Sequence, residues 1–312
     1  MGNNCYLLAK SPFWAYTYVK IITNWKDEKV KVIVADGCGF CPGVRNAIKI
    51  AQETLAKRAN VYSLGEIIHN KDVVGQLADA GLKISEEIKK IPSGTVIIRS
   101  HGAGEQQLKQ IRKQGLKIVD ATCILVKRVQ KIAKMLHKQG YKVVIIGDKG
   151  HPEVQAVLGS APDISVIGST KDIAILGRNK KLGIICQTTQ SPEHFAKMIA
   201  QIVKTPFSEL KVINTLCKEA IKRQTCAVEL CQKVDIMFIL GGLHSANTKK
   251  LAELCKKYNK KTFHLQNFKE LDKKVLFGNN TAGVTAGAST PQWIIDNFVE
   301  NLQKFNSGRK KK

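Results

Sequence analysis

Val32-Ile33-Val34-Ala35-Asp36 is a short apolar run, and Gly39-Phe40-Cys41-Pro42-Gly43-Val44 follows it and opens a helical pattern. The same order of apolar run, cysteine and helical periodicity recurs from Ile118 to Cys123 and from Val212 to Cys217. The three cysteines lie at similar intervals, which indicates equivalent points on three similar units. The positive end of a helix dipole stabilises a thiolate, the form of cysteine that binds metal. Three thiolates that met at one point would hold an iron–sulfur cluster and leave one iron open for chemistry.

From residue 31 onward, short β-branched runs alternate with stretches of helical periodicity. This alternation predicts parallel α/β sheets with right-handed crossovers, which bind ligands at the carboxyl ends of their strands. Helical periodicity is clearest at Val44–Lys57, Ile124–Gln139, Glu193–Val203 and Pro291–Lys304. We expect strands near Val32–Ala35, Val61–Leu64, Val96–Arg99, Lys117–Val119, Lys142–Ile146, Ile164–Ile167, Gly183–Cys186, Lys211–Ile213, Ile236–Leu240, Thr262–Leu265 and Ala282–Val284.

The cysteine spacing divides the 312-residue chain into three α/β domains, residues 31–123, 124–215 and 216–304. Residues 1–30 hold scattered aromatics without a continuous apolar core, so we expect a poorly ordered N-terminal extension and not a signal peptide. Residues 305–312 form a basic C-terminal tail. No apolar stretch reaches the roughly 18 residues of a membrane span, so we expect no membrane partner.

The formal net charge is +25, from 50 Lys and Arg against 25 Asp and Glu. Only Arg309–Lys312 is a dense basic run, so a solvated basic surface is the first explanation. Attraction for a small anionic substrate or an acidic electron carrier is the second, and we expect no nucleic-acid partner. Nine cysteines at irregular intervals favour metal or redox use in a reducing, cytoplasmic location over structural disulfides.

Cys38 and Cys41 form a Cys-x-x-Cys pair, which is typical of a thioredoxin-type dithiol or of half a zinc site. A zinc site would need a second close pair, and the chain has none. Cys226 and Cys231 lie on a helical stretch where we expect both to be buried. A dithiol alone leaves the repeated order of strand, cysteine and helix unexplained.

Nine short motifs, in one order along residues 31–304, resemble the LytB-type 4-hydroxy-3-methylbut-2-enyl diphosphate reductases, which end the non-mevalonate isoprenoid pathway. The resemblance implies three α/β domains in approximate threefold arrangement, each giving one cysteine to a central [4Fe–4S] cluster. The motifs are Gly39-Phe40-Cys41-Pro42-Gly43-Val44, Gly65-Glu66-Ile67-Ile68-His69-Asn70, Ser100-His101-Gly102, Asp120-Ala121-Thr122-Cys123, Gly150-His151-Pro152-Glu153-Val154, Gln187-Thr188-Thr189, Asn214-Thr215-Leu216-Cys217 with Arg223-Gln224, Ser245-Ala246-Asn247, and Gly283-Val284-Thr285-Ala286-Gly287-Ala288-Ser289.

By this resemblance Cys41, Cys123 and Cys217 each hold one iron, and Cys38 is a bystander. The fourth iron has no protein ligand and accepts the hydroxyl oxygen of the substrate. The remaining cysteines have no implied role, and we expect buried thiols at Cys5, Cys186, Cys226, Cys231 and Cys255.

His69, His101 and His151 each follow a strand candidate in a loop with glycine or asparagine. One such histidine is more often structural, but three in a basic α/β protein favour an anionic substrate, because imidazole donates to phosphate oxygens. In the family these positions line a diphosphate pocket. The resemblance adds Thr188, Ser245, Asn247 and Ser289 to the substrate-binding residues, whereas His244 and Ala246 depart from the Asn-Ser-Ser-Asn pattern of some members.

Glu153 at a helix start is, taken alone, a partner of the helix dipole. Reductive dehydroxylation needs a proton beside the leaving oxygen, and a carboxylic acid in a poorly hydrated pocket can supply it. The resemblance assigns this catalytic role to Glu153, with Thr188 relaying the proton. It also implies reduced ferredoxin or flavodoxin as electron donor, and isopentenyl and dimethylallyl diphosphate as products.

Two other classes stay open from the residues. A non-enzymatic iron–sulfur sensor that binds nucleic acid would hold a cluster but have no affinity for isoprenoid diphosphates. A nucleotide-binding α/β protein is the other, although no G-x-G-x-x-G or Walker loop follows any strand candidate.

Overall fold

The computed structural model describes residues 20–21 and 30–307. The chain divides into two compact units, one of Pro42–Ile221 and one that joins the chain up to Cys41 to the chain from Lys222 onward. The expected N-terminal extension lies outside the described residues except for Lys20, Ile21 and Val30, and the tail lies outside them from residue 308. Within the described residues no helix is long and apolar enough to cross a membrane.

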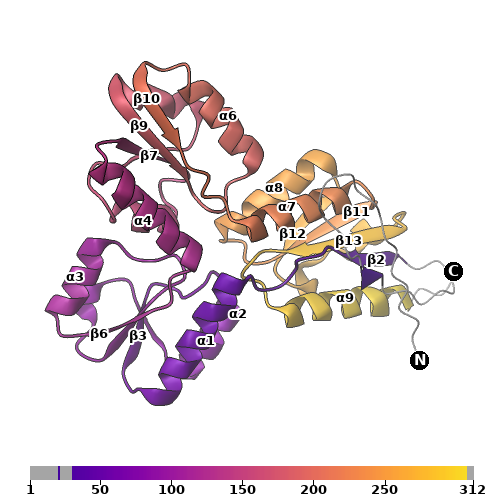
Figure 1. The fold of residues 1–312 in the computed structure, drawn as a ribbon. Coiled ribbons are helices and arrows are strands. Elements are labelled where there is room, and N and C mark those ends of the chain that lie inside the picture. Colours follow the sequence, from indigo (N-terminus) through magenta and orange to yellow (C-terminus); the bar gives the residue numbers. More distant parts are fainter. Residues whose placement is uncertain (1–19, 22–29, 308–312) are drawn as a thin grey trace. The chain divides into compact units, whose positions relative to one another are not determined.

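The unit Pro42–Ile221 holds two four-stranded parallel sheets (Figure 1). The first sheet has, in spatial order, β4 (Lys83–Ser85), β3 (Val61–Leu64), β5 (Thr95–Ile98) and β6 (Lys117–Asp120). The second has β8 (Ser165–Ile167), β7 (Lys142–Ile146), β9 (Asn179–Cys186) and β10 (Phe207–Val212). The helices are α1 (Pro42–Lys57), α2 (Lys71–Asp79), α3 (Glu105–Lys113), α4 (Ile124–Lys138), α5 (Pro152–Leu158) and α6 (Pro192–Ile202), with 3₁₀ turns η1 (Ile88–Lys90) and η2 (Thr170–Leu176).

The other unit is built on a third sheet, which is parallel except for an antiparallel edge strand. Its strands are, in spatial order, β12 (Thr262–Leu265), β11 (Ile236–Leu240), β13 (Thr281–Ala286), β2 (Lys31–Val34) and β1 (Lys20–Ile21). The remaining helices are α7 (Lys218–Cys231), which starts just before the unit boundary, α8 (Ala246–Tyr258) and α9 (Gln292–Ser307), with 3₁₀ turns η3 (Phe268–Glu270) and η4 (Lys273–Leu276).

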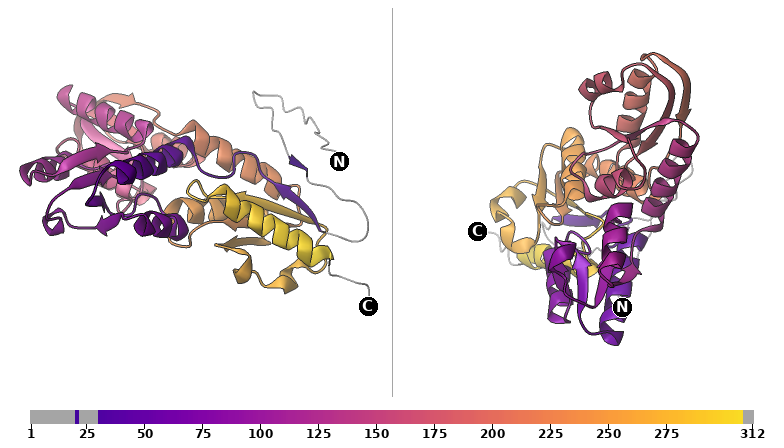
Figure 2. Two further views of the ribbon diagram at one scale, coloured as in Figure 1. Left: turned by 90° about the horizontal axis from the view of Figure 1, so that it is seen from below. Right: turned by 90° about the vertical axis from the view of Figure 1, so that its left-hand side faces the viewer.

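Helices cover both faces of the third sheet (Figure 2). Phe238, Val284 and Phe298 belong to one core cluster, which packs α9 against one face. Met237 and Ile239 point to the opposite face, where they meet α7 and α8. All five residues of β11 are buried, because a parallel strand in the middle of such a sheet faces apolar side chains on both sides.

The three sheets share one strand order. In the first sheet β6 leads to Cys123 and pairs with β5, which leads to His101. In the second, β10 leads to Cys217 and pairs with β9, which leads to Thr188. In the third, β2 leads to Cys41 and pairs with β13, which leads to Ser289. On their other side, β5, β9 and β13 pair with β3, β7 and β11, which lead to His69, His151 and Ser245 respectively. The strands β4, β8 and β12 come next in the three sheets. The repeat expected from cysteine spacing is therefore present in the topology, and the prediction of parallel α/β sheets is confirmed.

Three features differ from the expected element pattern, the first being the two-residue strand β1, which the sequence did not predict. β4 was not expected, because Lys83-Ile84-Ser85 is a mostly exposed edge strand with no apolar run to mark it. β2, which the cysteine spacing groups with residues 31–123, hydrogen-bonds to β13 of the third sheet, whereas Cys123 and Cys217 follow strands of the other two. The domain boundaries themselves stay a prediction.

A close glycine contact joins the loops of the first two sheets. A methyl group added at Gly159 would lie 2.6 Å from the Cα of Gly104, and the Glu105 amide donates to the Gly159 carbonyl at 2.8 Å. Gln130 on α4 donates to the Ala103 and Ala156 carbonyls beside this contact, each at 3.0 Å. The two backbones therefore touch at a distance that only glycine allows.

Gly159→Ala is expected to lower the free energy of unfolding by about 2–3 kcal/mol, since backbone on both sides must shift. Gly75→Ala is the matched control, because a methyl group there meets nothing within 4 Å and Gly75 lies inside α2. That change should raise stability by about 0.5–1 kcal/mol. Urea denaturation of both variants checks the expectation, and equal stability of the two would contradict the close contact.

Candidate functional site

Three histidine rings gather at the carboxyl ends of β3, β5 and β7, in the unit Pro42–Ile221. The ring centroids of His69 and His101 are 4.8 Å apart, and those of His101 and His151 are 5.6 Å apart. The strands come from two sheets, so residues far apart in sequence converge at one place. The sequence expectation that these loops meet agrees with this geometry, and their role as ligands of a diphosphate stays a prediction.

The histidines differ in their hydrogen bonding. His151 caps α5, and its Nδ1 accepts the Glu153 amide proton at 3.2 Å, so a neutral ring carries its proton on Nε2. The Nδ1 of His101 is shielded from solvent and finds no hydrogen-bond partner among the described residues. Burial, followed by the charges of His69, His151 and Arg99, lowers the pKa of His101 well below its usual value. His101 is therefore held neutral, with one buried nitrogen available to a ligand.

His69 lies against an acidic and basic cluster. Its Nδ1 is 3.5 Å from the Glu66 carboxylate, and Arg99 lies over Gly65, where an added methyl group would meet Nη1 at 2.6 Å. Burial lowers the pKa of Arg99, and the nearby Glu86 and Glu66 carboxylates oppose this effect. Gly65 has φ +74°, a left-handed backbone conformation that favours glycine at this position.

Glu153 and Thr188 form an enclosed polar pair in the site. The Thr188 amide donates to Oε1 of Glu153 at 2.7 Å, and the Thr188 hydroxyl donates to Oε2 at 2.8 Å. Glu153 is 2% exposed and Thr188 is 5% exposed. Burial raises the pKa of Glu153, and the two hydrogen bonds from Thr188 only partly offset this effect. The carboxyl group is therefore biased towards its protonated form, as a proton donor requires.

Gln187 fixes the loop that carries Thr188. Its Oε1 accepts the Asp148 amide proton at 2.9 Å, and its Nε2 donates to the Thr189 hydroxyl at 3.0 Å. Gln187 itself is fully buried, whereas its partners Asp148 and Thr189 are half-buried, so the loop is fixed from its inner side.

Each of the three proposed cysteine ligands is tied through its backbone to a neighbouring site loop. Cys123 donates its amide to the Ser100 carbonyl at 2.9 Å, just before His101. Cys217 donates to the Thr188 carbonyl at 2.8 Å, and Cys41 donates to the Ala288 carbonyl at 3.2 Å, just before Ser289. All three thiols are half-buried and precede a helix, as expected.

Within residues 20–21 and 30–307, no group of three or more His, Cys, Asp or Glu side chains is arranged to hold a metal. Cys41 ends one unit, and Cys123 and Cys217 belong to the other. The thiols of Cys186, Cys226, Cys231 and Cys255 are buried as expected, and Cys5 lies outside the described residues. Burial raises the pKa of Cys38, whose Sγ lies 3.6 Å from the Thr285 hydroxyl.

Ser245, Asn247 and Ser289 lie at the carboxyl edge of the third sheet. Ser245 caps α8 and accepts the Thr248 amide at 3.3 Å. The Oδ1 of Asn247 is buried and has no hydrogen-bond partner among the described residues. Ser289 is half-buried in the loop between β13 and α9. These side chains belong to a different unit from the histidines.

Arg223 has a structural role that the sequence reading left unassigned. It is 8% exposed and donates to the Ala286 carbonyl at 2.9 Å and to the Gly39 carbonyl at 2.8 Å. Arg223 thus joins the loop before Cys41 to the end of β13. Its position on the apolar row with Cys226, Ala227 and Leu230 was the available signal, because a cation on a buried helix face needs fixed acceptors.

The fold and these loops define an α/β protein with three equivalent sheets, whose strand ends present cysteine, histidine and short polar side chains. The model of the LytB protein family matches residues 32–303, so the chain belongs to that family. It is 40% identical over 282 residues to the 4-hydroxy-3-methylbut-2-enyl diphosphate reductase of Geobacter sulfurreducens, covering 90% of this chain and all of that protein. The Geotalea uraniireducens protein of the same name is 41% identical over 281 residues, covering 90% of this chain and 99% of the relative.

Two solved structures are also similar. A structure of (E)-4-hydroxy-3-methyl-but-2-enyl diphosphate reductase, described as the terminal enzyme of the non-mevalonate pathway, has a TM-score of 0.65 and 38% identity, covering 88% of this chain and 99% of that one. The E-1-hydroxy-2-methyl-but-2-enyl-4-diphosphate reductase from Plasmodium falciparum has a TM-score of 0.83 and 28% identity, covering 88% of each chain.

The raised pKa of Glu153 predicts a pH dependence of stability. The folded protein binds this proton more tightly than the unfolded chain, so its stabilising effect is complete below the ordinary value of 4.5 and is lost as pH rises through the folded pKa. Glu153→Gln removes the effect. The free energy of unfolding of the variant minus that of the wild type should therefore increase above pH 4.5, by at most about 1.4 kcal/mol per pH unit. Urea denaturation from weakly acidic to neutral pH measures this difference, and a constant or shrinking difference would contradict the assignment.

Proposed function

We propose that the chain reduces (E)-4-hydroxy-3-methylbut-2-enyl diphosphate to isopentenyl and dimethylallyl diphosphate, the last step of the non-mevalonate pathway. The observation that carries the proposal is the buried Glu153–Thr188 pair beside the histidine loops, in a chain of the LytB family. The overall change replaces a C–OH bond with a C–H bond and releases water, at a cost of two electrons and two protons.

The donor set suits an iron–sulfur cluster. Cys41, Cys123 and Cys217 are half-buried thiols at equivalent strand ends, each followed by a helix, and fully buried thiols elsewhere do not share this position. A [4Fe–4S] cluster held by these three cysteines would supply electrons and, at an iron without a protein ligand, a Lewis acid for the hydroxyl oxygen. The three domains are proposed to lie in an approximately threefold arrangement around this cluster.

The diphosphate is proposed to bind His69, His101, His151, Ser245, Asn247 and Ser289. Nε2–H of His151 is a donor because Nδ1 is occupied by the Glu153 amide. The buried Nδ1 of His101 supports a polar ligand, since an unsatisfied buried polar atom is costly, whereas Asn247, whose Oδ1 is an acceptor, would donate to the diphosphate through its amide Nδ2. Hydroxyl, imidazole and amide groups can bind phosphate oxygens in this setting without a fixed positive charge at each contact.

Glu153 is proposed to hold the proton that the departing hydroxyl needs. Burial raises the pKa of the Glu153 carboxyl and so favours the form that holds the proton, which would pass to the departing hydroxyl. The Thr188 hydroxyl, 2.8 Å from Oε2, can orient the substrate hydroxyl and relay the proton. The enclosed position of the pair excludes bulk water from competing for that proton.

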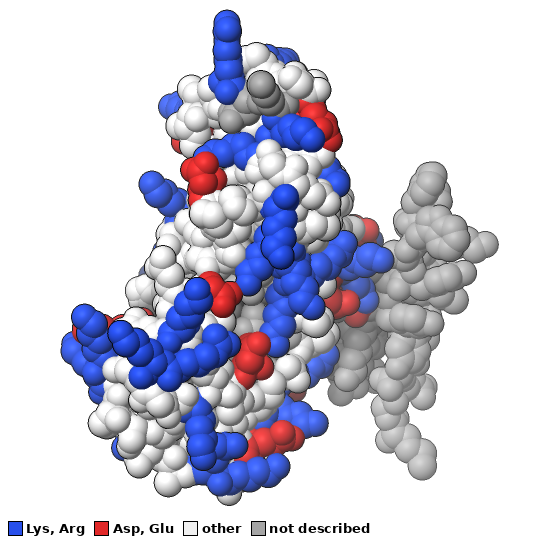
Figure 3. All heavy atoms as spheres, turned by 60° about the vertical axis from the view of Figure 1, so that its left-hand side comes forward, with Lys and Arg blue, Asp and Glu red and all other residues white. Residues whose placement is uncertain are grey.

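The electrons are proposed to come from reduced ferredoxin or flavodoxin, which deliver them one at a time. Attraction between an acidic carrier and a chain of net charge +25 supports this choice. Lys and Arg side chains cover much more of the face shown in Figure 3 than Asp and Glu do.

Glu153→Gln is expected to lower kcat by about 10²–10⁴-fold while KM changes little, because the amide keeps the shape and loses the proton. Thr188→Val should also lower kcat, whereas Thr188→Ser, which keeps the hydroxyl, should retain most of it. The assay is anaerobic turnover of the hydroxylated diphosphate with a chemical reductant, scored for five-carbon diphosphate products. Full activity of Glu153→Gln would reject the proton-donor role.

The same assay separates the enzyme from an iron–sulfur sensor. A sensor would contain iron yet form no five-carbon products, and it would bind nucleic acid through its positive charge. Iron-containing wild-type protein that gives no product with substrate and reductant would overturn the proposed function.

A further inference from the structure

One row of side chains on α4 is exposed along the whole helix. Ile124, Arg128, Lys131, Met135 and Lys138 follow one another at alternating spacings of four and three residues, so they share one face. Ile124 is 74% exposed and directly follows Cys123, which is the helix N-cap. The row therefore begins next to the proposed cluster ligand Cys123, and it consists of two apolar and three basic residues.

The core of the unit does not account for this row. α4 uses a different face for packing, where Val126, Val129, Ala133 and Leu136 are buried. Two other cations of the helix are engaged at its flanks, Lys127 with Asp120 at 2.6 Å and Lys134 with Glu105 at 2.8 Å. Within the described part of the chain, Arg128 and Lys131 have no ion pair, so their charges face outward.

We propose that this α4 row is the docking surface for an acidic one-electron carrier protein. The inference rests on the proposed function, because it assumes that Cys123 is a cluster ligand and that electrons must reach it. Ile124, at the Cys123 end of the row, would be the apolar contact nearest the proposed cluster, and Arg128 and Lys131 would attract carboxylates of the carrier. Transient redox encounters are typically small and are steered by charge.

Charge complementarity decides the occupant. A second copy of this chain, also at +25, would be repelled from the row, and an acidic protein would be attracted. The basic residues of the row would also attract nucleic acid, but the exposed Ile124 adds little to such binding, because most protein–DNA hydrogen bonds go to phosphate and sugar. Binding of a nucleic-acid duplex at this row in place of the carrier is therefore an outcome that would overturn the proposal.

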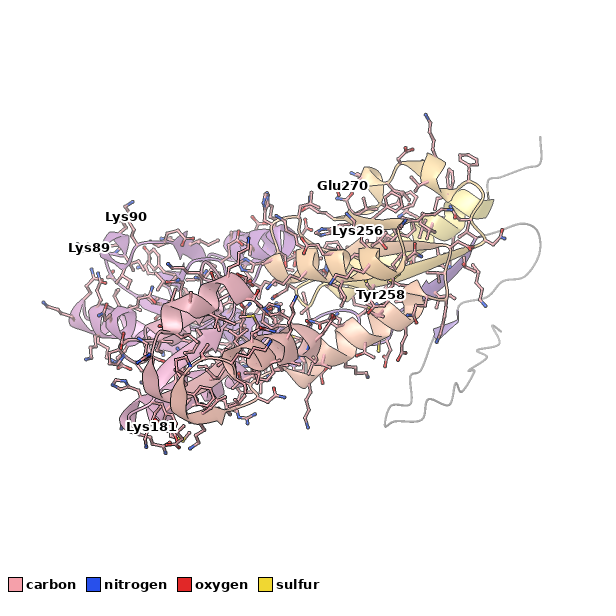
Figure 4. All side chains as sticks on the ribbon, turned by 90° about the horizontal axis from the view of Figure 1, so that it is seen from above. Lys89, Lys90, Lys181, Lys256, Tyr258 and Glu270 are labelled. Carbon is pink, nitrogen blue, oxygen red and sulfur yellow. The ribbon has the colours of Figure 1, made fainter. Side chains whose placement is uncertain are left out.

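The test uses a charge-reversal pair, Arg128→Glu with Lys131→Glu, and separately Ile124→Ser. The matched control is Lys89→Glu with Lys113→Glu, which changes the net charge equally. Lys89 projects from η1 (Figure 4), and Lys113 is exposed at the end of α3. Lys113 ends α3 four residues before β6, at the amino edge of the first sheet, and Lys89 lies in the connection between β4 and β5, so neither is on α4.

The probe is a [2Fe–2S] ferredoxin of net negative charge. Its second-order rate of reducing the anaerobic holoprotein should fall about 10-fold or more in the Arg128 and Lys131 pair at low ionic strength, and the control should stay within about 2-fold. The difference should vanish at high salt, where the charges are screened. Turnover driven by dithionite should be unchanged in all variants.

Affinity for oxidised ferredoxin, measured by titration calorimetry, gives a second readout that needs no turnover. It should fall in the test pair and in Ile124→Ser but not in the control. Equal effects of test and control pairs, on rate and affinity alike, would overturn the docking surface. Failure of the proposed function would look different, because wild-type protein would then give no product with dithionite while ferredoxin affinity could still be compared.

Discussion

The backbone hydrogen bond from each proposed cysteine ligand to the neighbouring site loop is the constraint on which the site depends. It occurs three times, from Cys123 to Ser100, from Cys217 to Thr188 and from Cys41 to Ala288. Parallel strands end at one edge of a sheet, so a cysteine after one strand and a polar residue after the next are neighbours by topology. Each proposed cluster ligand is therefore fixed through its backbone to a loop that carries a proposed substrate-binding residue.

Burial sets the charge states around this frame. Desolvation raises the pKa of Glu153 and lowers the pKa of His101, so both groups favour their neutral forms. A neutral carboxyl retains a proton to give, and a neutral imidazole offers one nitrogen as a donor and the other as an acceptor. The charged groups nearby are Arg99, Glu66 and Glu86, and the two carboxylates raise the pKa of Arg99 against the effect of burial. In the proposed mechanism, proton transfer would therefore fall to the enclosed Glu153–Thr188 pair, and attraction of an acidic partner to the exposed basic surface.

Much of this was predictable from local pattern. Apolar runs such as Lys142–Ile146 and Ile236–Leu240 coincide with strands because buried parallel strands need continuous apolar residues. β4 escaped prediction because an exposed edge strand carries no such run, and the pairing of β2 with β13 depends on contacts across most of the chain. Residue identity marked the Glu153 loop, but only the fold brings Thr188 to both carboxylate oxygens. Arg99 and Arg223 were missed as site supports, because their acceptors and neighbours come from distant loops.

The most direct measurement is the iron and acid-labile sulfide content of anaerobically purified protein, compared with single serine variants of Cys38, Cys41, Cys123 and Cys217. The account predicts about four irons per chain in the wild type and in Cys38→Ser, because Cys38 is a bystander. It predicts loss of the cluster in each of the other three variants, since each removes one of three ligands. A wild type without iron, or a Cys41→Ser protein that keeps its cluster while Cys38→Ser loses it, would contradict the account.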